Sequence, residues 1–255
     1  MHNDGTGGRV TYSVIGSPID ALDESGALQR IASWAGKGKS RTVYRCNAHS
    51  LVTARRDPAF ATIIRQADMA LADGAPVAWM LRRQGVKGQR RVYGPDLMWA
   101  YCAHAAAHGE AIYLFGASPG TLQALQDKLR TAFPGLIIAG ASSPPFRPLT
   151  AEEDAAIVAA INTSGASTLW VSLGCPKQEH WITAHRGHIQ PVLLGVGGAF
   201  DFHAGTAKQA PAWMRNNGLE WLHRLWSEPR RLWKRYLVTN TLFIAYAIQT
   251  LWQQR

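Results

Sequence analysis

The sequence predicts an α/β protein with a Rossmann-like, mostly parallel sheet, helices on both faces of that sheet, and a basic helical appendage at the C-terminal end. Short apolar runs of strand length alternate along the chain with longer segments of helical periodicity. Several of these runs end in a glycine turn that leads directly into a helix start, as in parallel-sheet proteins. After Pro211 the sequence changes to a mixture of tryptophan and basic residues.

The individual elements are predicted from hydrophobic spacing and from the turn residues that separate them. Strands are expected at the short apolar or β-branched runs 10–15, 42–44, 69–72, 111–115, 136–139, 168–173 and 191–196. Helices are expected where apolar residues recur at helical spacing, at 20–36, 51–54 with 60–64, 77–81, 93–108, 121–133, 151–163 and from 177 onward. Residues 1–9 are polar and contain glycine, so we expect a disordered N-terminus there. The predicted division is therefore 1–9, a core over 10–210, and an appendage over 211–255.

Composition narrows the class of protein. The formal charge of +10 over 255 residues indicates an anionic partner, which is a nucleotide, a nucleic acid or an acidic lipid. The three cysteines are far apart and show no CxxC spacing, which is typical of a reducing compartment and gives no zinc site. The first residues contain no apolar signal-peptide core, and no run reaches the roughly 20 apolar residues of a transmembrane helix. We therefore expect a cytoplasmic protein.

One junction between a strand and a helix carries polar side chains suited to a sugar or a uracil ring. The strand 168–173 ends at Gly174 and Pro176, and Gln178 and Glu179 then open a helix. Gln178 both donates and accepts hydrogen bonds, and Glu179 accepts them when ionised. In an open parallel sheet, ligands bind at the carboxyl ends of the strands. The alternative interpretation is a helix start whose acidic residue complements the helix dipole.

Two glycine turns follow other predicted strands. The turn Gly116–Gly120 precedes a helix, and its backbone N–H groups suit a phosphate or a nucleotide base. It is neither a GxGxxG motif nor a Walker motif, so it is a weak signal on its own. The glycine pair at 197–198 lets the backbone approach a ligand closely. Asp201, just after that pair, is expected at the same sheet edge as Gln178.

Asp73 follows the strand 69–72 in an Asp-Gly turn. A carboxylate at this edge of the sheet can act as a general base, and an Asx-type turn or a helix N-cap is the alternative interpretation.

The basic run 82–91 is typical of a solvated face, but Arg91 comes just before a helix start and is a candidate phosphate contact. Asp96 in the first turn of that helix complements its dipole.

The appendage combines tryptophan with positive charge. Its tryptophans are Trp213, Trp221, Trp226, Trp233 and Trp252, and residues 215–235 contain Arg215, Arg224, Arg230, Arg231, Lys234 and Arg235 against Glu220 and Glu228. Cationic helices that carry tryptophan bind well at a bilayer surface. The final apolar run is too short and too interrupted to span a bilayer. We expect contact with an anionic membrane surface, and a helical pair packed on the core is the alternative.

Five segments of the chain, taken in order, resemble the WecG/TagA/CpsF glycosyltransferase family (glycosyltransferase family 26). The segments are ADGAPVAW (72–79), VYGPDLM (92–98), LGCPKQEHWI (173–182), GVGGAFDFHAGTAKQAPAWM (195–214) and GLEWLHRLWSEPRRLWKR (218–235). The resemblance covers about residues 10–237. One such segment is a weak signal, whereas five in the same order are specific.

The resemblance implies an inverting, metal-independent glycosyltransferase without a cofactor, in agreement with the absence of a DxD pair from the sequence. The implied reaction moves a hexose or N-acetylhexosamine-type sugar from a UDP-sugar to a polyprenyl-diphosphate-linked saccharide, in surface or exopolysaccharide biosynthesis. The implied location is the cytoplasmic side of the cell membrane, with peripheral association at its inner face. The resemblance does not specify the donor sugar, the acceptor glycan or the oligomeric state, and a homo-oligomer is possible. It also does not specify whether residues 238–255 insert into the membrane or lie on its surface.

The resemblance also implies roles for single residues. Asp73 matches the proposed catalytic base. Seven residues match positions that the family uses for substrate binding: Asn47, Arg91, Gln178, Asp201, Arg224, Arg231 and Lys234. Four more residues complete the predicted substrate-binding set: Arg45, Asp96, Gly116 and Glu179. The chain departs from the family pattern at Arg45, where threonine is frequent, and at Gln209, where arginine is usual. The first departure lies at the expected donor pocket, and the second removes one cation near the appendage.

Two functions from other classes are consistent with parts of the sequence. A nucleic-acid-binding protein would use the basic C-terminal segment, and the net charge supports it. No recognised nucleic-acid module is present, so nucleic acid is not the expected partner. A nicotinamide-dependent oxidoreductase would use the parallel sheet, but the missing GxGxxG motif counts against it.

Overall fold

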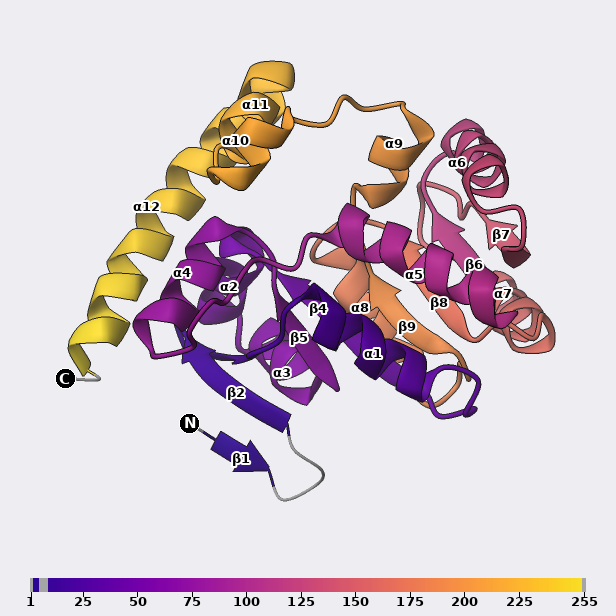
Figure 1. Ribbon diagram of the computed structural model, residues 1–255, viewed down its shortest axis with the longest axis horizontal. Helices are drawn as coiled ribbons and strands as arrows, with labels where there is room; N and C mark the ends of the chain where they lie inside the picture. Colours follow the sequence, from indigo (N-terminus) through magenta and orange to yellow (C-terminus); the bar gives the residue numbers. More distant parts are fainter. Residues whose placement is uncertain (1, 5–8, 254–255) are drawn as a thin grey trace. The chain divides into compact units, whose positions relative to one another are not determined.

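The computed structural model describes residues 2–4 and 9–253, except for the side chains of residues 2–4, Asn216 and Arg231. Contacts within the chain divide it into two compact units, and the helices and strands of both are labelled in Figure 1. Unit 1 comprises Met1–Glu24, Arg45–Val92 and Gln209–Arg255, and unit 2 comprises Ser25–Tyr44 and Tyr93–Lys208. The C-terminal segment therefore forms one compact unit with residues that lie far from it in the sequence.

The strands of unit 1 are β1 (His2–Asp4), β2 (Arg9–Val14), β3 (Ser17–Asp20) and β5 (Met69–Ala72), in the spatial order β1-β2-β3-β5. The first two pairings are antiparallel and β3 pairs with β5 in parallel. Disorder was expected over residues 1–9, but His2–Asp4 forms a strand because extended backbone there satisfies the open edge of β2. Met1 and residues 5–8 lie outside the described residues.

A buried ion pair ties these strands together. Two nitrogens of the Arg9 guanidinium, Nε and Nη2, donate to the two carboxylate oxygens of Asp20, each at 2.9 Å, and Asp20 also accepts from the backbone N–H of Ala70 at 2.7 Å. Asp20 is completely buried. The sequence placed Asp20 at the start of a helix, but it ends β3, and helix α1 (Glu24–Trp34) begins later. The pair holds β5 in place, and β5 leads directly to Asp73.

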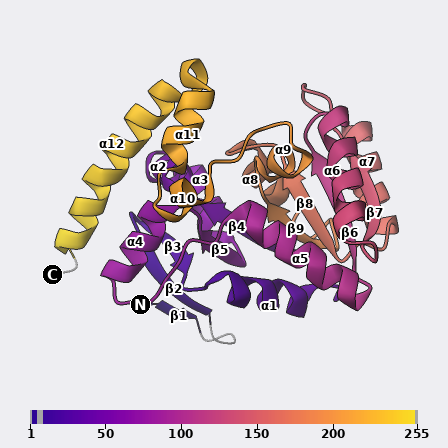
Figure 2. The same ribbon diagram turned by 45° about the horizontal axis from the view of Figure 1, so that its top comes forward.

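The helices of unit 1 are α2 (Ala48–Arg56), α3 (Pro58–Gln66), α4 (Ala75–Arg83), α10 (Ala212–Asn216), α11 (Glu220–Ser227) and α12 (Pro229–Gln253). Helix α2 ends and α3 begins at Asp57 because the Asp57 side chain caps α3. It accepts from the backbone N–H groups of Ala59 and Phe60, at 2.9 and 3.2 Å, and Pro58 follows it. Helix α12 packs along α2, and α11 lies beside α12, as Figures 1 and 2 both show. In the described residues, no helix combines the length and the apolar content needed to cross a bilayer.

Unit 2 contains the parallel sheet that the sequence predicted. Its strands are β4 (Arg41–Cys46), β6 (Ala111–Gly116), β7 (Ile137–Ser142), β8 (Thr168–Ser172) and β9 (Val192–Gly195), in the order β4-β9-β8-β6-β7. All four pairings are parallel. The last two residues of β4 belong to unit 1. The predicted α/β class with a mostly parallel sheet is thus confirmed.

The helices of unit 2 are α1 together with α5 (Gly94–His108), α6 (Pro119–Ala132), α7 (Ala151–Thr163), α8 (Lys177–Ala184) and α9 (Ala199–Ala204). Trp170 on β8 is the largest of the fully buried side chains. Its indole N–H donates to the Thr168 hydroxyl at 3.0 Å, and its ring lies 5.4 Å from that of Tyr101. Helix α9 was not predicted, because the sequence analysis assigned no element after the glycine pair at 197–198.

We predict that Gly116→Ala strongly destabilises the protein. Gly116 has φ +115°, and a Cβ atom there would lie 2.3 Å from the backbone oxygen of Ser172 on the adjacent strand β8. The free energy of unfolding should fall by roughly 2–5 kcal/mol. Gly120→Ala, in the first turn of α6 where a Cβ atom meets nothing within 4 Å, is the matched control and should change stability by less than about 1 kcal/mol. Urea unfolding compares the two variants, and equal stability would contradict the prediction.

Candidate active site

Asp73 lies immediately after β5, in a turn that backbone contacts hold in place. Its N–H donates to the carbonyl oxygen of Cys46, at the end of β4, at 3.0 Å. Gly74 has φ +103°, which only glycine adopts without strain, and it is the N-cap of α4. The N-cap interpretation of Asp73 is therefore wrong, since the cap is Gly74. The Asp73 carboxylate does not serve as that cap.

The Asp73 carboxylate forms an ion pair with Arg45, which stands where threonine is frequent in the family that the sequence resembles. Its Oδ2 accepts from Nη1 of Arg45 at 2.9 Å, and the two side chains are 12% and 11% exposed. Burial is the largest influence on this carboxyl and raises the pKa of Asp73, while Arg45 opposes that rise. The net effect is a raised pKa, which makes Asp73 a stronger base than an aspartate in water. Such a perturbed group is typical of a functional site.

Further charges from distant segments surround Asp73. Glu220, the first residue of α11, raises the pKa of Asp73, and Arg91 and Arg224 lower it. Nη1 of Arg91 donates to Oε2 of Glu220 at 2.7 Å. The structure thus brings together four of the predicted site residues, Arg45, Asp73, Arg91 and Arg224. It adds Glu220, which the sequence showed only as one acidic residue in a basic segment.

Close backbone packing brings α11 to this position. A Cβ atom at Gly218, just before α11, would lie 2.7 Å from the Cβ of Ala75, the first residue of α4. Gly218 has φ +72°, so the lack of a side chain serves both the turn and the close approach. The start of α11 therefore packs beside the Asp73 turn. This contact explains why cations of the appendage influence Asp73.

Three other predicted residues of unit 1 lie on α2 and α12. Asn47 caps α2, where its side-chain oxygen accepts from the N–H of Ser50 at 3.1 Å and the Ser50 hydroxyl accepts from the N–H of Asn47 at 2.9 Å. Its amide oxygen is therefore committed to the helix. Lys234 is exposed on α12 and lines a cavity between α12 and α2. Arg231 lies in α12, but its side chain is outside the described residues.

In unit 2, Gln178 and Glu179 are buried, at 3% and 1% exposure. The side-chain oxygen of Gln178 accepts from the N–H of Gly197 at 3.0 Å, and its amide nitrogen donates to Glu179 at 2.9 Å. A Cβ atom at Gly195 would lie 3.1 Å from that nitrogen. Gln178 therefore ties the start of α8 to the turn after β9. Its buried side chain supports this turn.

The remaining predicted residues of unit 2 lie at helix starts. Asp96 is exposed in the first turn of α5, and Asp201 is half-buried in α9, where its carboxylate accepts from the Thr206 hydroxyl at 3.3 Å. Gly116 ends β6, and the turn continues to Ser118, which caps α6 by accepting from the N–H of Thr121 at 3.2 Å. No cluster of three or more His, Cys, Asp or Glu side chains is placed to hold a metal ion in residues 9–253.

A comparison with known protein families identifies one family. A family model described as the glycosyl transferase WecG/TagA/CpsF family matches residues 12–255, which is nearly the whole chain. The family is one of glycosyltransferases of cell-surface polysaccharide biosynthesis, so a sugar donor and a glycan acceptor are implied.

The raised pKa of Asp73 predicts a specific pH dependence of stability. The pKa in the folded protein lies above the ordinary value of 3.8, so the folded protein binds this proton more tightly than the unfolded chain does. Ionisation of Asp73 therefore lowers stability as the pH rises through the folded-state pKa. The free energy of unfolding of Asp73→Asn minus that of the wild type should increase from about pH 4 upward and then level off. Urea unfolding over a pH series measures this difference, and a constant or falling difference would contradict the raised pKa.

Proposed function

Because this chain belongs to the WecG/TagA/CpsF family of glycosyltransferases, we propose that it transfers a hexose or N-acetylhexosamine-type sugar from a UDP-sugar to a polyprenyl-diphosphate-linked saccharide. The proposed reaction inverts the anomeric centre and needs no metal. The observation that carries the proposal is the buried carboxylate of Asp73, whose pKa is raised and which is surrounded by arginines. A base and a group of cations are the two features that such a displacement requires.

Asp73 is the general base in this proposal. It takes the proton of an acceptor hydroxyl while the hydroxyl oxygen forms a bond to the anomeric carbon. The bond from that carbon to the UDP oxygen breaks at the same time, and UDP leaves with the electron pair. Attack from the face opposite the leaving group inverts the configuration.

Arginines of unit 1 stabilise the leaving group. Negative charge accumulates on the diphosphate as the bond to the sugar breaks, and fixed cations lower the energy of that charge. Arg91 and Arg224 are suited to this role because guanidinium groups bind phosphate oxygens in a bidentate manner. Both are close enough to Asp73 to alter its pKa. They supply the positive charge that a bound metal supplies in other transferases.

Arg45 holds the base in position. Its ion pair fixes one oxygen of the Asp73 carboxylate and favours the ionised form, which is the form that accepts a proton. Burial acts in the opposite direction and makes the carboxylate more basic. The balance of the two effects gives a base that is ionised yet basic enough to accept a proton from a hydroxyl.

For unit 2 we propose nucleotide binding. The turn from Gly116 to Ser118 leads into the N-terminus of α6, a 14-residue helix whose first N–H groups suit an anion or a base edge. Gln178 shapes the adjacent turn after β9 through its bond to Gly197. Glu179 supports that amide, and Asp96 and Asp201 offer carboxylates for sugar hydroxyls.

We also propose peripheral association with the inner face of the cell membrane. Large apolar side chains of the appendage are exposed, among them Trp213, Trp226, Trp233 and Trp252. Exposed tryptophan beside basic residues favours a bilayer surface with anionic lipids. Membrane contact would place Arg231 and Lys234 near a lipid-linked acceptor.

Asp73→Asn is expected to lower acceptor-dependent transfer by about 10²- to 10⁴-fold while UDP affinity changes less than about twofold, because only proton removal is lost. Transfer is measured as UDP release, with the donor from a UDP-sugar panel that gives acceptor-dependent release, and affinity by calorimetry. Asp127→Asn makes the same chemical change at an exposed position on α6 and should be silent. Retained transfer in Asp73→Asn would remove Asp73 from the role of base. Absence of release with every donor, by folded protein, would contradict the use of UDP-sugars.

Arg91→Gln is expected to lower kcat/KM for the donor roughly 10- to 100-fold, because a charged contact to the diphosphate is lost. Arg90→Gln removes the same charge from the adjacent, exposed position and should have little effect. Glu220→Gln breaks the Arg91–Glu220 ion pair but keeps the arginine, so it separates loss of the pair from loss of the phosphate contact. Equal losses in Arg91→Gln and Glu220→Gln would show that Arg91 acts only through the ion pair.

A further inference from the structure

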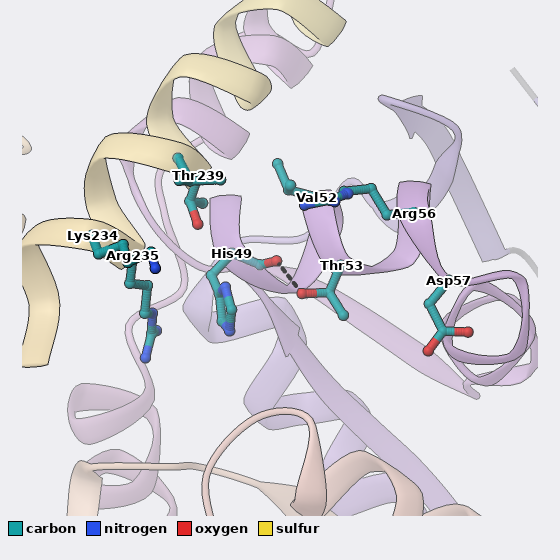
Figure 3. Close-up of a pocket in the computed structure, with 9 residues that line it drawn as sticks. His49, Val52, Thr53, Arg56, Asp57, Lys234, Arg235 and Thr239 are labelled. Atoms are coloured by element: carbon teal, nitrogen blue, oxygen red, sulfur yellow. Dashed lines mark hydrogen bonds between the residues drawn. The ribbon is translucent and has the colours of Figure 1, made fainter.

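A cavity of about 680 Å³ lies between α2 and α12 in unit 1, and none of its residues belongs to the Asp73 cluster described above (Figure 3). Helix α2 contributes His49, Val52 and Arg56 to its lining, and α12 contributes Lys234, Arg235 and Val238. Figure 3 shows the α2 residues His49, Val52 and Arg56 and the α12 residues Lys234 and Arg235. In this view, His49 and Arg235 extend in the same direction. The cavity therefore belongs to the contact between α2 and the appendage.

The cavity carries net positive charge at neutral pH. Arg56, Lys234 and Arg235 line it, and Asp57 is the carboxylate of its lining. Oδ1 of Asp57 already accepts two backbone N–H groups at the start of α3, so this carboxylate is committed to the helix cap. Burial, with Arg235 as the second cause, lowers the pKa of His49 to about 4, and the imidazole is therefore neutral. Cations on two facing helices suit an anion with several oxygens, such as a phosphate.

An apolar stripe runs along α12 next to the cavity. Trp233, Leu237, Ile244, Ile248 and Trp252 are each more than half exposed, and their spacing places them on one side of the helix. Lys234 and Val238, which line the cavity, each follow a residue of the stripe in the sequence. A ligand that fits both features has a phosphate close to long apolar chains. A nucleotide or a free phosphate matches only the cavity.

We propose that this cavity binds the phosphate-bearing head group of an anionic membrane phospholipid while the stripe contacts the acyl region. The inference deepens the membrane association proposed above and does not depend on the transfer chemistry. The charge of the cavity selects anionic over zwitterionic lipid, and the stripe supplies affinity that is independent of lipid charge. The appendage would thereby recognise the composition of the membrane as well as its surface.

The test uses co-sedimentation of the full chain with vesicles that contain no polyprenyl lipid. Vesicles of phosphatidylcholine alone are compared with vesicles of phosphatidylcholine and phosphatidylglycerol. Arg56→Gln should weaken binding to the anionic vesicles about five- to tenfold and leave binding to the neutral vesicles unchanged. Leu237→Gln should weaken binding to both kinds, because it alters the stripe.

Arg55→Gln is the matched control for Arg56→Gln. Arg55 is the preceding residue, is also exposed in the last turn of α2, and loses the same charge. Its guanidinium lies over the Tyr246 ring, 5.7 Å from the centroid, and it does not line the cavity. Arg55→Gln should therefore change binding to anionic vesicles less than about twofold. Equal losses for the two variants would overturn the inference, because they would show general attraction of charge.

Three further outcomes would overturn the inference. The first is binding of inorganic phosphate in the absence of vesicles. If this binding depends on Arg56, and if the same phosphate concentrations leave vesicle binding unchanged, the cavity would be assigned to a soluble anion. Arg56-dependent binding of a single-stranded oligonucleotide would assign it to nucleic acid. Absence of vesicle binding by the wild type would remove the lipid site, and acceptor-dependent UDP release in detergent would then show that the transferase proposal stands without it.

Discussion

The ion pair between Arg45 and Asp73 is the interaction on which the candidate site depends. Two charges are withdrawn from water at the ends of β4 and β5, and their contact at 2.9 Å compensates only part of the desolvation cost, since the pKa of Asp73 stays raised. The Asp73 carboxylate is therefore more basic than a carboxylate in water, and the fold holds it in that condition. The bond between the N–H of Asp73 and Cys46, and the Arg9–Asp20 pair beneath β5, provide the rigidity that this arrangement needs.

The appendage is part of the site in the structure of unit 1. Glu220 on α11 pairs with Arg91, and Gly218 packs on the first residue of α4, next to the Asp73 turn. Under the proposed mechanism, the diphosphate of the donor competes with Glu220 for Arg91. Glu220 neutralises the largely buried charge of Arg91. In this mechanism the donor diphosphate replaces Glu220 as the partner of Arg91. In that mechanism, donor binding is coupled to the position of α11.

Local sequence predicted the parts of the molecule that depend on local pattern. The strand at Met69–Ala72 and the helix at Ala151–Thr163 have the predicted bounds, because apolar run length and the Thr150 cap determine them. Strand β3 was missed since it is short, contains proline and is defined by pairing with β2 and β5. Asp73 was selected as a candidate from its position after a strand, and its catalytic role stays a prediction. Glu220 was not recognised, because its partner Arg91 lies 129 residues away and only tertiary packing brings them together.

Two groups of cations in unit 1 lie in different environments. Arg9, Arg45 and Arg91 are largely buried, and each pairs with a carboxylate, because an unpaired charge in those positions would destabilise the fold. Arg56 and Lys234 are exposed and line a cavity beside an apolar helix face. The fold does not require cations at these exposed positions, since neutral polar residues would be solvated equally well there. The lipid proposed above, an anion with an apolar body, would account for both the cavity and the stripe beside it.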